Sequence, residues 1–282
     1  METVAGFSVV IRDVETGDEL RAVEDLQRTT WGVRDLDVVP LTQLIAAKTA
    51  GGVLMGAFDG DEMVGFVYGF AGIEDGRPIH HSHMLAVRPE YRNHDLGRRL
   101  KFAQREQVLK QGIDVMTWTF DPLQSLNAHF NFNKLGVVSD RYFVDFYGRD
   151  ASSFLHRTGT DRLWVSWHLN SRRVLDKVAG KDARIDLPEA EPMLELKEGE
   201  VPHIVKMQGV PSVPRLSIDI PLDITEIEST DFELAAEWRN ATRTAFQAAI
   251  GAGYRVVGYY PITGEPGKRG VYLLVPRSED ED

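Results

Sequence analysis

Short apolar runs alternate with helix-like repeats along the first 170 residues. The pattern predicts strands at residues 7–13, 53–58, 62–70, 79–87, 113–120, 137–147 and 162–169, and helices that open after Thr16, at Pro40, after Gly97 and at Ser125. Thr16 and Glu19 have the spacing of a capping box, and Asp59-Gly60-Asp61 suits a tight turn between two strands. We expect a loop at Gly72–Pro78. The order β-α-α-β-β-β-α-β-α-β-β predicts an α/β protein, more narrowly an α+β arrangement of a mixed sheet with helices.

The pattern changes beyond residue 170. Residues 171–214 contain an acidic, proline-bearing stretch with little periodicity, and we expect a connector or a long excursion there. Regular segments then resume, with strands at 215–220, 255–260 and 271–275 and a helix at 231–249. We therefore predict a first domain at 1–170, a connector at 171–214 and a C-terminal α+β unit at 215–282, whose acidic tail Ser278–Asp282 is expected to be disordered. Three interpretations of this unit stay open: a half-repeat, a lid, or a dimerisation arm that would form a homodimer.

The composition is that of an acidic chain without cysteine. The 282 residues carry 43 Asp and Glu against 32 Lys and Arg, a formal net charge of −11. Nucleic-acid partners favour net positive surfaces, so we expect none, whereas a small anion held by a local arginine cluster fits this charge. The absence of cysteine excludes disulfides, thiolate metal sites and a cysteine nucleophile. The sequence has neither a long apolar run nor a signal-peptide pattern, which predicts a cytoplasmic protein with no membrane partner.

The segment Leu85–Leu100 has the pattern of a strand, a proline-marked turn and a loop that opens a helix. Arg92, Gly97 and Arg98 lie in or beside that loop. The first N–H groups of a helix have no partner within the helix, and the helix dipole adds partial positive charge there. The segment is therefore a candidate phosphate or pyrophosphate site. An ordinary strand–loop–helix corner is the alternative.

Two motifs within this order of predicted strands and helices resemble those of the GNAT N-acetyltransferase superfamily. The first is Arg92-Asn93-His94-Asp95-Leu96-Gly97, and the second is Phe132-Asn133-Lys134-Leu135-Gly136; the likeness in element order covers roughly residues 5–170. The resemblance implies a GNAT-like acyl-CoA N-acyltransferase fold with a C-terminal α+β extension. It also implies that the co-substrate is acetyl-CoA or another acyl-CoA. The implied coenzyme-binding residues are Leu85, Ala86, Val87, Arg92, Asn93, His94, Asp95, Leu96, Gly97 and Arg98. Asn127 is a further candidate for bonding the coenzyme, with a role in turning the start of its helix as the alternative.

The chain departs from the family pattern at two positions. Asp95 stands where the family has the first loop glycine, and its carboxylate would lie near a pyrophosphate. Phe132 stands where many members have a tyrosine that is credited with protonating the leaving thiolate, and Phe132 has no proton to give. A non-catalytic acyl-CoA-binding or sensing protein is therefore the alternative to an enzyme.

Acyl transfer to an amine needs a base, a site for the oxyanion and an acid for the thiolate. Alternation along the strand places His81 and His83 on one face and His80 and Ser82 on the other. His83 is our candidate base, or a strand histidine that is hydrogen-bonded for structure. Asp121 is a candidate for orienting His83 or the amine, or a helix cap. Tyr142 is a candidate acid in place of Phe132, or a strand aromatic. His81 and His83 also have metal-ligand spacing, but we expect no metal because nothing else in the sequence assembles a site.

A narrower resemblance adds a substrate hypothesis. The runs Ser82–Leu85 and Met116–Leu123 resemble a longer GNAT subfamily, some members of which act alongside enzymes of N-acylamino-acid metabolism. This resemblance implies an acyltransferase that acts on the primary amine of a small molecule, with amino acids and succinyl-CoA as specific options.

Overall fold

The computed structural model describes residues 2–4, 7–148, 157–181, 187–197, 201–205, 209–264 and 268–277. The predicted tail Ser278–Asp282 and parts of the predicted connector lie outside these residues. The chain divides into two units, the first up to Trp118 and the second from Thr119 onward. No helix among the described residues is long and apolar enough to cross a membrane. The domain boundaries predicted at residues 170 and 214 stay a prediction.

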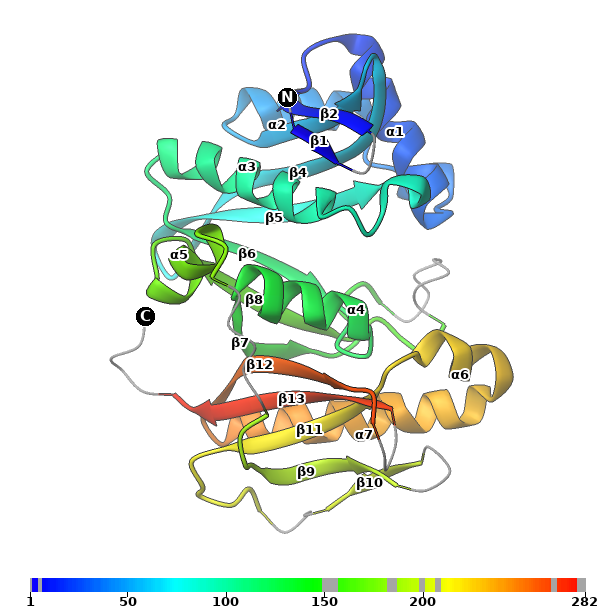
Figure 1. The fold of residues 1–282 in the computed structure, drawn as a ribbon, viewed down its shortest axis with the longest axis vertical. Coiled ribbons are helices and arrows are strands. Elements are labelled where there is room, and N and C mark those ends of the chain that lie inside the picture. The colour runs from blue at the N-terminus through cyan, green and yellow to red at the C-terminus, as the bar shows by residue number, and fades with distance from the viewer. Residues whose placement is uncertain are drawn as a thin grey trace. The chain divides into compact units, whose positions relative to one another are not determined.

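The first unit is a mixed sheet with helices (Figure 1). Its elements are β1 (Glu2–Val4), β2 (Phe7–Asp13), α1 (Gly17–Trp31), the short 3-10 helix η1 (Asp35–Asp37), α2 (Leu41–Thr49), β3 (Val53–Asp59), β4 (Glu62–Glu74), β5 (Arg77–Val87), the 3-10 helix η2 (Pro89–Tyr91), α3 (Leu96–Lys110) and β6 (Val115–Phe120). The strands follow the order β1-β2-β3-β4-β5-β6, and every neighbouring pair is antiparallel except β5 and β6, which are parallel. The predicted mixed α/β arrangement is confirmed.

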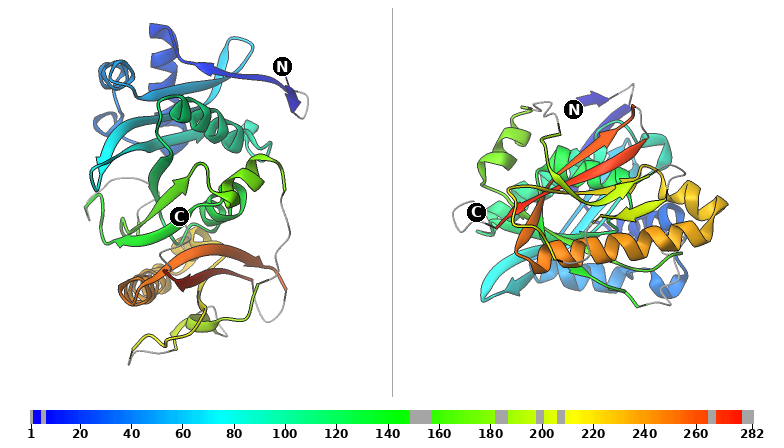
Figure 2. Two further views of the ribbon diagram at one scale, coloured as in Figure 1. Left: turned by 90° about the vertical axis from the view of Figure 1, so that its left-hand side faces the viewer. Right: turned by 90° about the horizontal axis from the view of Figure 1, so that it is seen from below.

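Local sequence explains where α1 begins and which side it buries. The Thr16 hydroxyl accepts a hydrogen bond from the Glu19 N–H at 3.2 Å, and the Glu19 carboxylate accepts from the Thr16 N–H at 3.1 Å, so the predicted capping box is present. Leu20, Val23 and Leu26 lie on one face of the helix and pack into the core beside β3 and β4. In Figures 1 and 2, α1 and α2 lie on one face of the strands of this unit and α3 on the other.

The loop predicted at Gly72–Pro78 is wrong. β4 continues to Glu74 and β5 begins at Arg77, so the two strands form one long hairpin. Asp75 and Gly76 make the turn with φ of 49° and 76°, the left-handed conformation that tight hairpin turns need. The glycine and proline that suggested a loop are paired within the ladder, as Gly72 with Ile79 and Ile73 with Pro78.

The second unit combines a hairpin, several helices and a C-terminal layer of strands. Its elements are α4 (Ser125–Ala128), the π-helix η3 (His129–Leu135), β7 (Val138–Phe143), β8 (Arg162–His168), α5 (Arg172–Val178), β9 (Glu191–Leu196), β10 (Pro202–Ile204), β11 (Leu216–Pro221), α6 (Ile224–Thr230), α7 (Phe232–Gly251), β12 (Tyr254–Ile262) and β13 (Arg269–Pro276). The strand order is β8-β7-β12-β13-β11-β9-β10. Within this unit α7 covers one face of the strands and residues 125–135 the other (Figures 1 and 2).

The helix predicted to begin at Ser125 is confirmed: it is a short α-helix that continues as a π-helix, and Gly136 ends it in the left-handed conformation with φ of 80°. The stretch 171–214, expected to be a connector, contains α5, β9 and β10 among its described residues. β9 pairs in parallel with β11, a partner distant in sequence, and local periodicity carries no signal of such pairing.

Candidate functional site

The loop between β5 and α3 contains two residues in left-handed conformations directly before the helix. Asn93 and Asp95 adopt left-handed conformations, with φ of 64° and 57°. Asp95 is the residue before α3, and it takes the conformation for which the family pattern has glycine. The departure at this position therefore keeps the backbone shape of the loop and changes its charge.

Three arginines around the loop have different roles. The Arg98 guanidinium pairs with the Asp95 carboxylate at 3.2 Å, which offsets its negative charge. Arg92 donates to the Val87 carbonyl at 3.2 Å and is exposed. Arg99 instead donates to the Val9 carbonyl at 3.0 Å, so it ties α3 to β2. The first hydrogen bond within α3 runs from the Arg99 N–H to the Asp95 carbonyl at 3.0 Å, and the N–H groups of residues 96–98 precede it.

The backbone of β5 pairs with its two neighbours at different places. Leu85, Ala86 and Val87 pair with β4, at residues 65–67. The described pairing with β6 is at His80 with Met116 and His81 with Thr117, earlier along the strand. The segment Leu85–Val87, which is predicted to bind the coenzyme arm through its backbone, is therefore hydrogen-bonded to β4.

His83 lies in a β-bulge. Ser82 pairs with Gly69 and Met84 pairs with Tyr68, so His83 is the extra residue on β5. The bulge reverses the alternation of the strand. His80 and Ser82 point toward α3, whereas Met84 and Ala86 beyond the bulge pack against the core cluster of α1 and α2. Bulges of this kind re-aim a side chain and are frequent beside active sites.

The rings around His83 make an aromatic wall. His83 is 5.9 Å from Phe70 and 6.2 Å from Tyr68 between ring centroids, and Phe70 lies 5.5 Å from His81. His83 is solvent-exposed, yet its aromatic surroundings desolvate the ring and lower its pKa below 6.5. Desolvation also lowers the pKa of His81 to about 4, and the nearby His83 and Lys101 contribute. Both imidazoles are therefore neutral near pH 7, the form that accepts a proton.

A buried polar network that sequence analysis did not identify lies on the opposite face of β5. Lys101 Nζ donates to Ser82 Oγ at 2.7 Å, Ser82 Oγ donates to Gln104 Oε1 at 2.7 Å, and Gln104 Nε2 is 3.3 Å from His80 Nε2. Lys101 Nζ also lies 3.5 Å from the centre of the Trp118 ring. Burial lowers the pKa of Lys101 well below its usual value and that of His80 to about 4. The only sequence signal is that Lys101 and Gln104 share a helix face with Leu100 and Val108.

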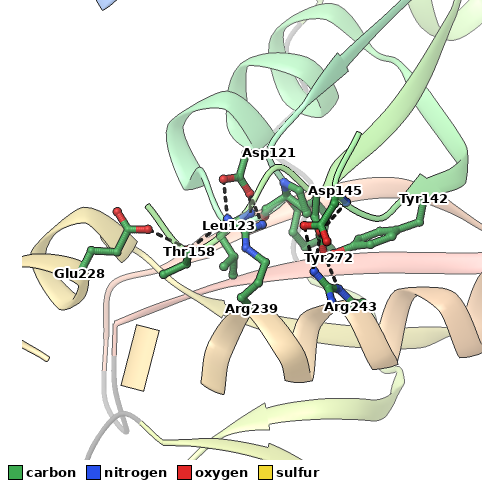
Figure 3. Close-up of polar contacts among 11 residues, drawn as sticks. Asp121, Leu123, Tyr142, Asp145, Thr158, Glu228, Arg239, Arg243 and Tyr272 are labelled. Atoms are coloured by element: carbon green, nitrogen blue, oxygen red, sulfur yellow. Dashed lines mark hydrogen bonds and ion pairs between the residues drawn. The ribbon is translucent and has the colours of Figure 1, made fainter. Parts of the chain in front are cut away.

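Asp121 is held by a buried ion pair in the second unit (Figure 3). Arg239 of α7 donates to both carboxylate oxygens at 2.7 Å, and the Leu123 N–H donates to Oδ1 at 2.9 Å. Both side chains are buried, and the Asp121 carboxylate outweighs burial and raises the pKa of Arg239. The bond to Leu123 fits the cap role of the prediction. His83 belongs to the first unit, so the proposed contact between Asp121 and His83 stays a prediction.

Tyr142 belongs to a second ion-pair cluster on α7 (Figure 3). Its hydroxyl donates to Asp161 Oδ2 at 2.6 Å, and its ring stacks on Phe246. Arg243 binds both Asp161 oxygens at 2.8 Å. Burial and the Asp161 carboxylate raise the pKa of Tyr142 far above 10. These contacts hold the phenol proton on Tyr142.

The remaining predicted residues of the second unit have contrasting environments. Phe132 is buried and packs edge-to-face on Phe120 and Tyr272, so it is a core residue. Asn127 is exposed on α4. Among the residues that the structure describes, no group of three or more His, Asp or Glu side chains is placed to hold a metal ion.

The first unit is a mixed α/β arrangement in which the strand that carries His83 leads through a loop with two left-handed residues into a helix. Residues 20–136 match the sequence profile of the Acetyltransferase (GNAT) family. These residues carry a GNAT acetyltransferase domain.

Solved structures of similar fold include several acetyltransferases. The ribosomal-protein-S18-alanine N-acetyltransferase from Escherichia coli is 14% identical over 56% of this chain and 92% of its own, with a TM-score of 0.44. The aminoglycoside 6'-N-acetyltransferase from Enterococcus faecium is 19% identical over 58% and 98%, with a TM-score of 0.43. A GNAT family acetyltransferase from Elizabethkingia anophelis with acetyl-CoA bound is 14% identical over 57% and 98%, with a TM-score of 0.43. No curated protein matches the chain.

Proposed function

We propose that the protein transfers an acyl group from an acyl-CoA to the primary amine of a small molecule. The observation that carries the proposal is the left-handed backbone at Asn93 and Asp95 directly before α3, in a domain that matches the GNAT profile. The first N–H groups of a helix have no partner within the helix, and this suits a pyrophosphate. Arg92 and Arg98 supply positive charge beside it, and the Leu85–Val87 backbone would pair with the pantetheine arm.

The proposed reaction is a direct attack on the thioester. His83 accepts a proton from the amine, the amine nitrogen forms a bond to the carbonyl carbon, and the carbon–sulfur bond breaks. The coenzyme thiolate then takes a proton from solvent. Exposure of His83 and its lowered pKa support the role of base at neutral pH. Amino acids are one acceptor option and succinyl-CoA one donor option.

Coenzyme binding is the first experiment. Isothermal titration with acetyl-CoA and succinyl-CoA should give saturable binding, and Arg98→Ala should weaken it by about tenfold or more, because a charge-assisted hydrogen bond is worth roughly 1.5–3 kcal/mol. Arg21→Ala, an exposed arginine on α1, is the matched control and should bind like the parent protein. Failure of every acyl-CoA to bind would refute the proposal.

Turnover separates an enzyme from a binding protein. A panel of amino acids and simple amines is incubated with the bound acyl-CoA, and release of the free thiol is measured. Binding without thiol release on any amine would favour the alternative of a non-catalytic acyl-CoA sensor.

A further inference from the structure

The polar network of His80, Ser82, Lys101 and Gln104 lies buried between β5 and α3. Its desolvation costs free energy that a purely structural apolar contact would not. Lys101 is 3% exposed, and its described partners are one hydroxyl and the face of Trp118. A buried amine without a carboxylate loses its hydration and gains little in return, and an apolar side chain of similar size is often at least as stable in such a place. The network also leaves His80 Nδ1 buried without a hydrogen-bond partner among the described residues.

The network lies next to the bulge. Ser82 is the last residue of β5 before His83, and it accepts from Lys101 and donates to Gln104. On the other side of the bulge, Met84 and Ala86 are held by apolar packing against the α1 and α2 cluster. A bulge that moves by one residue along a strand turns the side chains between its old and new positions to the opposite face. The hydroxyl anchor before His83 and the apolar anchor after it together oppose such a move.

Gly69 shows that β4 accommodates this network. Gly69 is the partner of Ser82 across the ladder. A Cβ atom at Gly69 would collide with His80 Nε2 and lie 2.9 Å from Gln104 Nε2. The space above Gly69 is thus occupied by the polar side chains, which could not keep their places beside any larger residue.

We propose that Lys101 and Gln104 are positioning residues that fix Ser82 and thereby hold the β-bulge that presents His83. The inference rests on the proposed function in one respect, the role of His83 as base. The ionisable groups that face the two sides of the bulge in the described first unit include His80 and Lys101 on the α3 side, and His81, His83 and Tyr68 on the aromatic side. A bulge fixed in this way keeps His83 against Phe70 and Tyr68, where its ring is desolvated.

The test compares two substitutions at Ser82 by a readout that needs no activity. Histidine side-chain NMR follows the titration of His83 in the full chain without ligand. Ser82→Ala removes the hydroxyl anchor, and the pKa of His83 should rise toward its ordinary value as the ring leaves the aromatic wall. Ser82→Thr keeps the hydroxyl and should restore the parent titration. Gln27→Leu is the control, since Gln27 is a buried polar side chain of α1 that bonds the N–H and the carbonyl of Val39 rather than Ser82 or Lys101.

Kinetics provide the second readout. If His83 is the base, Ser82→Ala should lower kcat on the order of tenfold to a hundredfold and shift its pH profile, because small misplacements of reacting groups have effects of that size. The affinity for acyl-CoA should be unchanged. Lys101→Met removes the other end of the anchor with a side chain of similar length, and it should reproduce the effects of Ser82→Ala even if that variant folds poorly.

The outcomes separate the two proposals. A chain that binds no acyl-CoA but shows the His83 shift refutes the proposed function and supports the positioning role. Unchanged His83 titration in both Ser82→Ala and Lys101→Met, with each variant folded by circular dichroism, overturns the positioning role whatever the activity. A shift of equal size in Gln27→Leu would likewise overturn it, because any loss of stability would then suffice.

Discussion

Acid should destabilise the first unit through His80. This imidazole is fully buried beside Gln104, and burial lowers its pKa from 6.5 to about 4 in the folded chain. Between pH 6.5 and pH 4, His80 is therefore protonated in the unfolded chain but stays neutral in the folded chain. The free energy of unfolding falls as the pH drops through this range. The linkage relation gives a loss of about 2 kcal/mol at pH 5 and about 3 kcal/mol at pH 4, relative to pH 7.5.

The assay is urea unfolding followed by tryptophan fluorescence at several pH values between 7.5 and 4. His80→Leu removes the titrating group and keeps an apolar side chain in its place. The parent protein should lose about 3 kcal/mol more than this variant over the range, and His81 is present in both proteins, so its own contribution largely cancels. His203→Gln, at an exposed position on β10, should lose stability in parallel with the parent. Parallel loss in His80→Leu and the parent would refute the reasoning.

Three further variants test other parts of the site. Asp95→Gly keeps the left-handed turn and removes a negative charge near the proposed pyrophosphate, so titration should show acetyl-CoA binding about two- to fivefold tighter, as expected for an exposed charge worth roughly 0.5–1 kcal/mol. Phe70→Ala removes part of the aromatic wall and should raise the KM for the amine, measured by thiol release, with coenzyme affinity unchanged. Tyr142→Phe removes a buried hydrogen bond and should lower the free energy of unfolding by roughly 1–2 kcal/mol with little change in kcat. A large fall in kcat would make Tyr142 the acid instead.

Local chemistry predicted most helices and strands of the first unit, but neither β1 nor the full length of the β4–β5 hairpin. Thr16 and Glu19 define the start of α1, and Asp59-Gly60-Asp61 predicts the turn between β3 and β4. Each of these signals involves residues a few positions apart, so it is visible in one sequence. The GNAT resemblance carried by Arg92–Gly97 depended on such a local motif too, and the family match confirms it.

Long-range pairing could not be predicted in the same way. The bulge at His83 arises because Ser82 and Met84 take consecutive partners on β4, and nothing in the order of residues 80–87 marks the extra position. Simple alternation predicted the faces of His80–His83 correctly. Beyond the bulge, the side chains lie on the opposite face from the one that alternation predicts. Asp121 likewise finds Arg239 at a distance of 118 residues, so a charge that looked available for chemistry belongs to a buried pair.

The buried contacts of the second unit determine which residues can serve as the acid for the leaving thiolate. Phe132 carries no proton, and Tyr142 gives its hydrogen bond to Asp161 in a place that raises its pKa. A thiol has an ordinary pKa of about 8.5, so the thiolate that leaves a thioester is a weak base near neutral pH and can depart before it is protonated. The step that needs help from the protein is removal of the amine proton, since an ammonium group cannot attack the carbonyl. A site with a fixed neutral imidazole and no dedicated acid is consistent with that demand, which is why the register of the bulge at His83 matters more to the proposed chemistry than the missing tyrosine.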